Sequence, residues 1–113
     1  MIRRFALPAL LLASLTAAPA TAGVNGFSIV NQTGAALSGL ELRRVGASKW
    51  TPLSASPADG ARATIAFEDP DCAFDLRGTV AGAGPAVWRV NLCDVKSVTL
   101  NRDPSGRAWV DYD

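Results

Sequence analysis

The sequence predicts an all-β protein: a small antiparallel β-sandwich of about seven short strands with one intrachain disulfide. Three observations lead to this fold class. Short runs of alternating apolar and polar residues recur after residue 22, turn-forming residues separate them, and the chain has only two cysteines. No window of helical length after residue 22 keeps a 3.6-residue apolar period. A small β-barrel is the alternative that the same pattern leaves open.

Each expected strand is one short β-prone run beside a turn signal. In chain order the runs are Phe27–Asn31, closed by Gln32-Thr33-Gly34; Leu40–Arg43; Ala63–Phe67, after the turn Pro57–Gly60; Cys72–Arg77; Val87–Leu92, after the glycine-rich break Ala81–Pro85; Val98–Leu100; and Arg107–Val110, after the turn Asp103–Gly106. The weakest segment is Val45–Ser56, which suggests a loop or a single helical turn.

The two central runs, Cys72–Arg77 and Val87–Leu92, are expected to form a hairpin. Alternation places Phe74 and Leu76 on its apolar face, and pairings such as Leu76 with Val90 and Phe74 with Leu92 join that face to the second strand. Cys72 and Cys93 fall on opposite faces of such a ladder, because one residue of slip inverts a strand. A disulfide between them therefore requires the regular pairing to end at Leu92 or at Asp71, through a bulge or a strand end.

The outer face of the same hairpin gathers Asp75, Arg77 and Arg89. We interpret this cluster as a solvated ion-pair surface of small energetic weight. Of the tryptophans, Trp88 alternates with the apolar positions of its strand and is expected in the core. Trp50 lies in the weakly patterned segment and is the better candidate for an exposed contact.

The N-terminal residues are those of an export signal. Arg3 and Arg4 give a positive start, residues 5–15 are uncharged and apolar, and small residues precede Gly23. We therefore expect residues 1–22 to be a signal peptide cleaved between Ala22 and Gly23, leaving 23–113 as a single domain. The lone arginine pair leaves the general and the twin-arginine export routes both open. The rest of the chain has no apolar stretch of membrane-spanning length, so no membrane span is expected in the mature protein.

Charge excludes several classes of partner. The chain has 11 basic and 10 acidic residues, and removal of Arg3 and Arg4 leaves nine against ten, a net charge of −1. A near-neutral chain with dispersed charges lacks the basic surface that nucleic acid or an anionic membrane requires. We therefore expect a periplasmic or secreted protein that binds no nucleic acid. In such an oxidising compartment Cys72 and Cys93 allow one intrachain pairing, which would contribute about 3 kcal/mol to a domain of this size.

Several stretches together resemble a family of small exported bacterial proteins of unknown function. They are Phe27–Gly34, with an N-x-T-G turn; Cys72–Arg77, which matches C-x-x-D-[IL]-[KR]; Val90–Cys93, with a [DN]-L-C strand end; and Val98–Leu100. The resemblance covers most of the mature chain and implies paired cysteines. The chain departs from the family around Trp50, where the expected acidic and glycine residues are missing. Relatives sometimes carry an argininosuccinate lyase label, which the chemistry of this chain does not support.

The sequence contains few of the side chains that enzymes use for catalysis. The sequence has no histidine, the commonest general base and metal ligand, and no G-x-S-x-G, S-x-x-K or phosphate-binding loop motif. We expect no catalysis and no cofactor. The favoured function is an exported domain that binds a protein or cell-envelope partner, and an inhibitor of a secreted enzyme is a variant of it. The alternative is a calcium-binding or small-ligand module that uses Glu68-Asp69-Pro70-Asp71, although this segment lacks the glycine and distal glutamate of a calcium loop.

Overall fold

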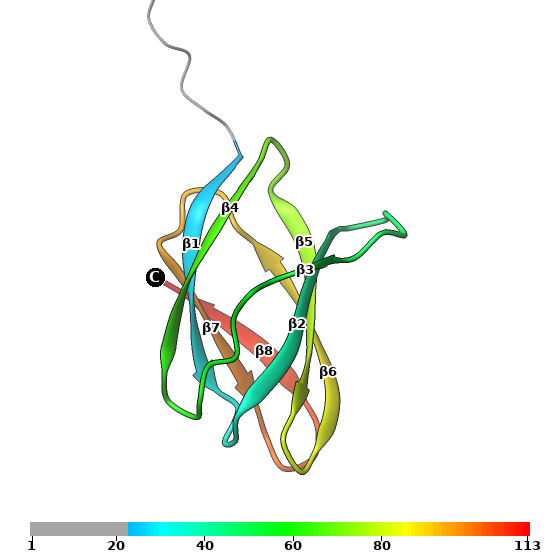
Figure 1. The fold of residues 1–113 in the computed structure, drawn as a ribbon, viewed down its shortest axis with the longest axis vertical. Coiled ribbons are helices and arrows are strands. Elements are labelled where there is room, and N and C mark those ends of the chain that lie inside the picture. The colour runs from blue at the N-terminus through cyan, green and yellow to red at the C-terminus, as the bar shows by residue number, and fades with distance from the viewer. Residues whose placement is uncertain (1–22) are drawn as a thin grey trace, which may run out of the picture.

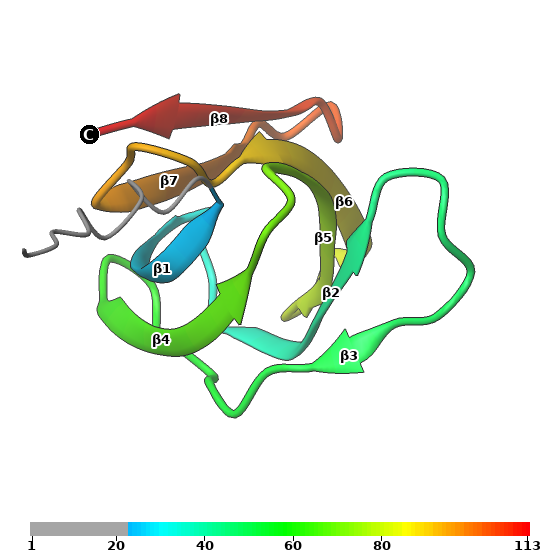
Figure 2. The same cartoon turned by 90° about the horizontal axis from the view of Figure 1, so that it is seen from above.

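The computed structural model describes residues 23–113, which form eight strands and no helix (Figure 1). The strands are β1 Val24–Gln32, β2 Leu37–Arg44, β3 Thr51–Pro52, β4 Arg62–Asp69, β5 Ala73–Val80, β6 Gly84–Asn91, β7 Ser97–Arg102 and β8 Ala108–Tyr112. They make two four-stranded sheets, with the orders β4-β1-β7-β8 and β3-β2-β5-β6. Viewed from above, the sheets curve around a common core (Figure 2).

The core between the sheets is built by strand alternation. Every second residue of β1, β5, β6 and β7 points inward, and the side chains that interdigitate include Ile29, Phe74, Trp88 and Leu100, all exposed by 2% or less. Burial of each such side chain contributes about 1.5–3 kcal/mol to the stability of the fold. The expected core position of Trp88 is confirmed, and its indole N–H donates to the carbonyl of Asn101 at 2.9 Å.

The predicted two-sheet fold is confirmed, and the barrel alternative is wrong because the two sheets remain separate. Two features differ from the expectation. β1 pairs with β7 in parallel, because the chain crosses from β6 into the other sheet and runs beside β1 in the same direction. The eighth strand, β3, lies in the weakly patterned segment after Trp50 and pairs with only two residues of β2.

The β5–β6 hairpin keeps the predicted faces but not the predicted pairs. Phe74 lies opposite Val90 and Leu76 opposite Trp88, two residues away from the expected register. A shift of two leaves every side chain on its original face. The shift arises because the connection between β5 and β6 is shorter than the glycine-rich break suggests, since β6 already begins at Gly84. Pro85 is tolerated inside this strand because β6 lies at the edge of its sheet.

A buried asparagine shapes the turn that follows β1. Asn31 is fully buried, and its side-chain amide donates to the carbonyls of Ala35 and Pro57 at 2.8 and 3.0 Å. Its Oδ1 accepts from the amide N–H of Thr33 at 3.0 Å and from the Thr33 hydroxyl at 2.6 Å. The N-x-T-G turn is therefore a structural device that ties the β1–β2 connection to the segment before β4.

The sandwich is closed on one side and open on the other. On the closed side, the main-chain N–H of Asn91 in edge strand β6 donates to the hydroxyl of Tyr112 in edge strand β8 at 2.9 Å. On the open side, β4 and the two-residue β3 are the edge strands. Between them, residues 51–54 and 64–67 line a groove of about 410 Å³.

Candidate functional site

The outer face of the β3-β2-β5-β6 sheet carries a carboxylate shared by two arginines. Direct register places Arg43 of β2 and Arg89 of β6 on either side of Asp75 in β5. Arg43 Nε donates to Asp75 Oδ2 at 3.3 Å, and Arg89 Nε donates to Oδ1 at 3.0 Å. The two guanidinium groups and their stems cover Asp75, which is only 3% exposed. This aspartate was expected to be solvated, and that part of the prediction is wrong.

Hydrogen bonding decides the ionisation of this buried carboxylate. The bond from Arg89 lowers the pKa of Asp75, burial opposes that effect by disfavouring the charged form, and the bond from Arg43 lowers the pKa further. The net direction is downward, so Asp75 is ionised at neutral pH and holds both arginines in place.

The ring of Trp50 contacts two guanidinium groups at the base of the β2–β3 loop, which projects from the body of the domain (Figure 1). The guanidinium carbon of Arg43 lies 4.3 Å from the centre of the Trp50 ring, and that of Arg77 lies 3.9 Å from it. Arg77 is fixed in turn by Glu41, with an Nε to Oε1 distance of 2.8 Å. Trp50 was expected to be an exposed contact, and it is instead half-buried because its ring lies on the two arginines of the sheet.

We call the surface formed by Arg43, Trp50, Arg77, Val87 and Arg89 the arginine face. Val87 lies directly opposite Arg77 and is 56% exposed, and the side chain of Arg89 is 70% exposed. Arg77 shares the outer face of β5 with Asp75, as expected, and forms its ion pair with Glu41. The contributions of Glu41 and Arg43 were missed because they depend on how β2 registers against β5, a pairing of residues more than 30 positions apart for which the sequence carries no local signal.

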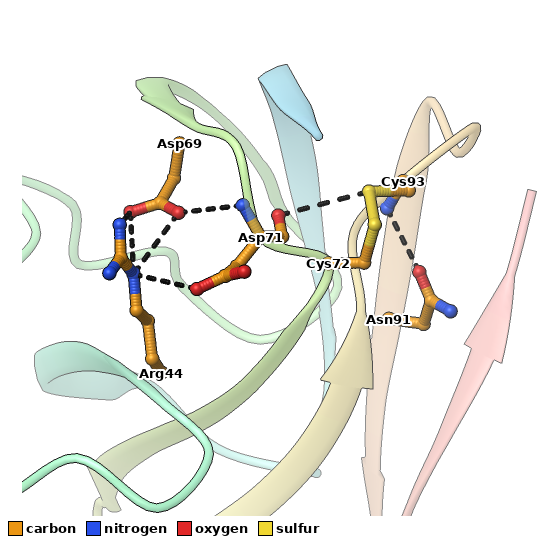
Figure 3. Close-up of a disulfide and its surroundings, with 6 residues drawn as sticks. All are labelled: Arg44, Asp69, Asp71, Cys72, Asn91 and Cys93. Carbon is orange, nitrogen blue, oxygen red and sulfur yellow. Dashed lines mark hydrogen bonds and ion pairs between the residues drawn. A yellow bond between two sulfur atoms is a disulfide. The ribbon is translucent and has the colours of Figure 1, made fainter. Parts of the chain in front are cut away.

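The disulfide lies at one end of the β5–β6 hairpin (Figure 3). The predicted bond between Cys72 and Cys93 is present, with Cα atoms 5.1 Å apart. Regular pairing ends at Ala73 and Asn91, and the Leu92 N–H then donates to the Cys72 carbonyl at 2.9 Å. Both cysteines therefore lie just beyond the ladder, where a strand's strict alternation of faces no longer separates them.

Beside the disulfide, Arg44 binds two of the acids proposed for calcium (Figure 3). Its guanidinium lies 3.1 Å from Asp69 and 3.0 Å from Asp71. The pKa of Arg44 is raised, first by the hydrogen bond to Asp69 and then by the charges of Asp69 and Asp71. Asp69 also accepts the main-chain N–H of Asp71 at 2.8 Å. Within residues 23–113, no three histidine, cysteine, aspartate or glutamate side chains are grouped to hold a metal ion.

The expected cleavage point lies at the start of the described chain. Ala22 falls outside the described residues, together with the rest of the segment predicted to be a signal peptide, and Gly23 is the first described residue. Gly23 has a φ of 110°, and a Cβ at this position would collide with the main chain of Asp69 and Pro70. Glycine is therefore required where β1 enters the fold, whether or not cleavage occurs before it. No helix of residues 23–113 has the length and apolarity to cross a membrane.

Comparison with known proteins places the fold but not the activity. No protein-family model and no curated protein sequence matches the chain. Among solved structures, the NMR structure of a protein from Eubacterium rectale is similar, with a TM-score of 0.51 over 86% of this chain and 94% of that chain. The two sequences are 12% identical, so the similarity extends to the fold alone.

Proposed function

We propose that this chain is an exported, non-catalytic domain that binds a protein or cell-envelope partner through the arginine face. The observation that carries the proposal is the Trp50 ring, which lies against the guanidinium groups of both Arg43 and Arg77 on an accessible sheet surface. Tryptophan and arginine are the residues that most often dominate the binding energy of protein interfaces.

The arginine face is ordered before any partner arrives. Asp75 fixes Arg43 and Arg89, and Glu41 fixes Arg77. Long side chains that are already fixed lose less conformational entropy on binding, so more of the contact energy becomes affinity. Arg43 and Arg89 reach Asp75 only through Nε, and their terminal Nη atoms have no hydrogen-bond partner within residues 23–113. These donors can therefore serve a partner's carboxylates or carbonyls.

The disulfide supports a location outside the cytoplasm. Such bonds persist in the periplasm and in secreted proteins, and reducing systems remove them in the cytosol. The charged, apolar and small-residue order of residues 1–22 agrees with export. The N-x-T-G turn and the paired cysteines also support membership of the family of small exported bacterial proteins that the sequence resembles.

The available side chains support the proposal that the domain is non-catalytic. The chain contains no histidine, and both cysteines are bonded to each other, so the usual general base and the strongest nucleophile are missing. The strongest carboxylate candidate, Asp75, has a lowered pKa and is covered by two arginines, and a general base or acid needs a pKa near the working pH.

The experiment compares two matched tryptophan variants of the oxidised mature protein. Trp50→Ala removes the centre of the arginine face, and Trp109→Ala removes the other partly exposed tryptophan, which is on the opposite sheet. Each protein is immobilised and exposed to periplasmic and cell-wall fractions of the source bacterium, and bound material is quantified by mass spectrometry. We expect one partner to bind wild type and Trp109→Ala and to lose at least about tenfold in affinity for Trp50→Ala, as for a hot-spot residue. Equal binding by both variants, or no enriched partner, contradicts the proposal.

A further inference from the structure

We propose that the partner of the arginine face presents an acidic side chain, which binds the free ends of Arg43 and Arg89, and an apolar side chain, which packs on Val87. This inference rests on the proposed function and adds the chemistry of the partner to it. The occupant is an extended protein segment in which a glutamate or aspartate lies two positions away from an apolar residue.

The arginine face has one positive charge more than its own acids balance. Arg77 is balanced by Glu41, whose Oε1 lies 2.8 Å from both Nε and Nη2 of Arg77. Arg43 and Arg89 share the single charge of Asp75. The other outward positions of β5 and β6 are uncharged, and they are Ala73, Thr79, Pro85, Val87 and Asn91. One further carboxylate therefore neutralises the face, whereas a neutral carbonyl would leave a charge unpaired once the surface loses its water.

The unbalanced charge lies at the surface. The side chains of Arg43 and Arg89 are 33% and 70% exposed and that of Asp75 is 5% exposed, so guanidinium groups and not the carboxylate meet solvent. Each arginine donates to Asp75 only through Nε, which leaves its two Nη groups without a hydrogen-bond partner within residues 23–113. Paired Nη groups match the two oxygens of a carboxylate, and such charge-assisted hydrogen bonds are about twice as strong as neutral ones.

Val87 supplies the apolar part of the binding surface. It is 56% exposed, and it lies two residues from Arg89 on the same outer face of β6. Outward side chains two residues apart on a strand are separated by about 7 Å. A partner segment in the extended conformation presents its own alternate side chains at the same spacing. An acid that faces Arg89 therefore places a residue two positions away over Val87.

The same features favour a peptide over an acidic polysaccharide. A chain of sugar acids carries the carboxylate, but its hydroxyl groups would leave Val87 without an apolar contact. The Trp50 ring, which could otherwise stack on a sugar, already contacts the guanidinium groups of Arg43 and Arg77 at 4.3 and 3.9 Å from its centre.

The test measures binding of short blocked peptides to the oxidised mature protein by NMR. The probe peptide has the sequence Thr-Glu-Thr-Leu-Thr, with acetylated and amidated ends, and its two controls replace Glu by Gln or Leu by Ser. We expect the probe to shift the indole N–H signal of Trp50 saturably, with a Kd of about 1 mM or tighter at about 20 mM salt. The Gln control should bind at least about fivefold more weakly, and the Ser control at least about twofold more weakly.

Two matched arginine variants locate the binding site. Arg89→Gln removes the unbalanced charge and leaves Asp75 bonded to Arg43, so it should weaken binding of the probe to that of the Gln control. Arg62→Gln, the same change at an exposed position on the opposite sheet, should leave binding unchanged. The comparison of the probe with the Gln control uses wild type alone, so it decides the question even if a variant fails to fold.

Several results would overturn the inference. They are equal binding of the probe and the Gln control, no saturable binding up to about 10 mM peptide, equal losses in both arginine variants, and tighter binding of an oligogalacturonate at the same concentration of carboxylate. Each of them leaves the proposed function intact if a partner is still captured by wild type and lost by Trp50→Ala, so the two failures are distinguishable.

Discussion

Replacing Cys72 and Cys93 together by serine is expected to lower the free energy of unfolding by about 3 kcal/mol without changing the fold. The two residues are 21 positions apart, and closing a loop of that length removes about 11 cal/mol/K of entropy from the unfolded chain, which is about 3 kcal/mol at 25 °C. The fold is expected to survive because the β5–β6 ladder runs without interruption from Ala73 to Val80 and buries Phe74 and Leu76 against the core.

Urea unfolding followed by tryptophan fluorescence measures the change directly, and Trp88 is a core reporter for it. A loss of 3 kcal/mol corresponds to a fall in Tm of about 12–24 °C for a domain of this size. Reduced wild type should match the double serine variant, and reductant should not affect the variant. A difference below about 1 kcal/mol, or loss of amide dispersion in NMR spectra of the variant, would refute the reasoning.

Three further predictions follow from the charged groups and the N-terminal segment. Asp75→Asn should cost about 1 kcal/mol at neutral pH, a value reduced by the exposure of both arginines. The pKa of Asp75 is lowered in the folded protein, so its contribution to the free energy of unfolding is fully present above the ordinary value of 3.8 and is lost as pH falls through the folded pKa. The difference in stability between wild type and variant should therefore close in acid and not in base. Calcium should show no binding tighter than about 1 mM by isothermal titration because Arg44 already binds Asp69 and Asp71, and a micromolar isotherm abolished by Asp69→Asn would contradict this. The intact mass of protein recovered from periplasm or medium should begin at Gly23, and a stable product that retains Met1 would disprove cleavage.

The elements that alternation predicts well are those with one buried face. Phe74, Leu76, Trp88 and Val90 each point inward as expected, because strand alternation is fixed by local geometry once a face is buried. The exact pairs were wrong by two residues because turn length, and not alternation, sets the register of a hairpin. The disulfide was predictable from an even cysteine count in a chain whose N-terminal pattern predicts export.

The candidate site was only partly predictable because it depends on long-range pairing. Asp75 and Arg89 belong to one hairpin, so the sequence places them on a common face. Arg43 joins them only because β2 lies beside β5, and Trp50 is held by contacts with Arg43 and Arg77, which belong to these two neighbouring strands. The parallel pairing of β1 with β7 could not be predicted from the sequence pattern either, because it brings together residues about 70 positions apart.

The central claim, that the arginine face is the binding surface, is tested most directly by site-specific photo-crosslinking in living cells of the source organism. A photoreactive phenylalanine analogue replaces Val87, which is exposed beside Arg77, or Trp109 on the opposite sheet. We expect one discrete crosslinked product for position 87 and none for position 109. No product at position 87, or the same product from both positions, would contradict it.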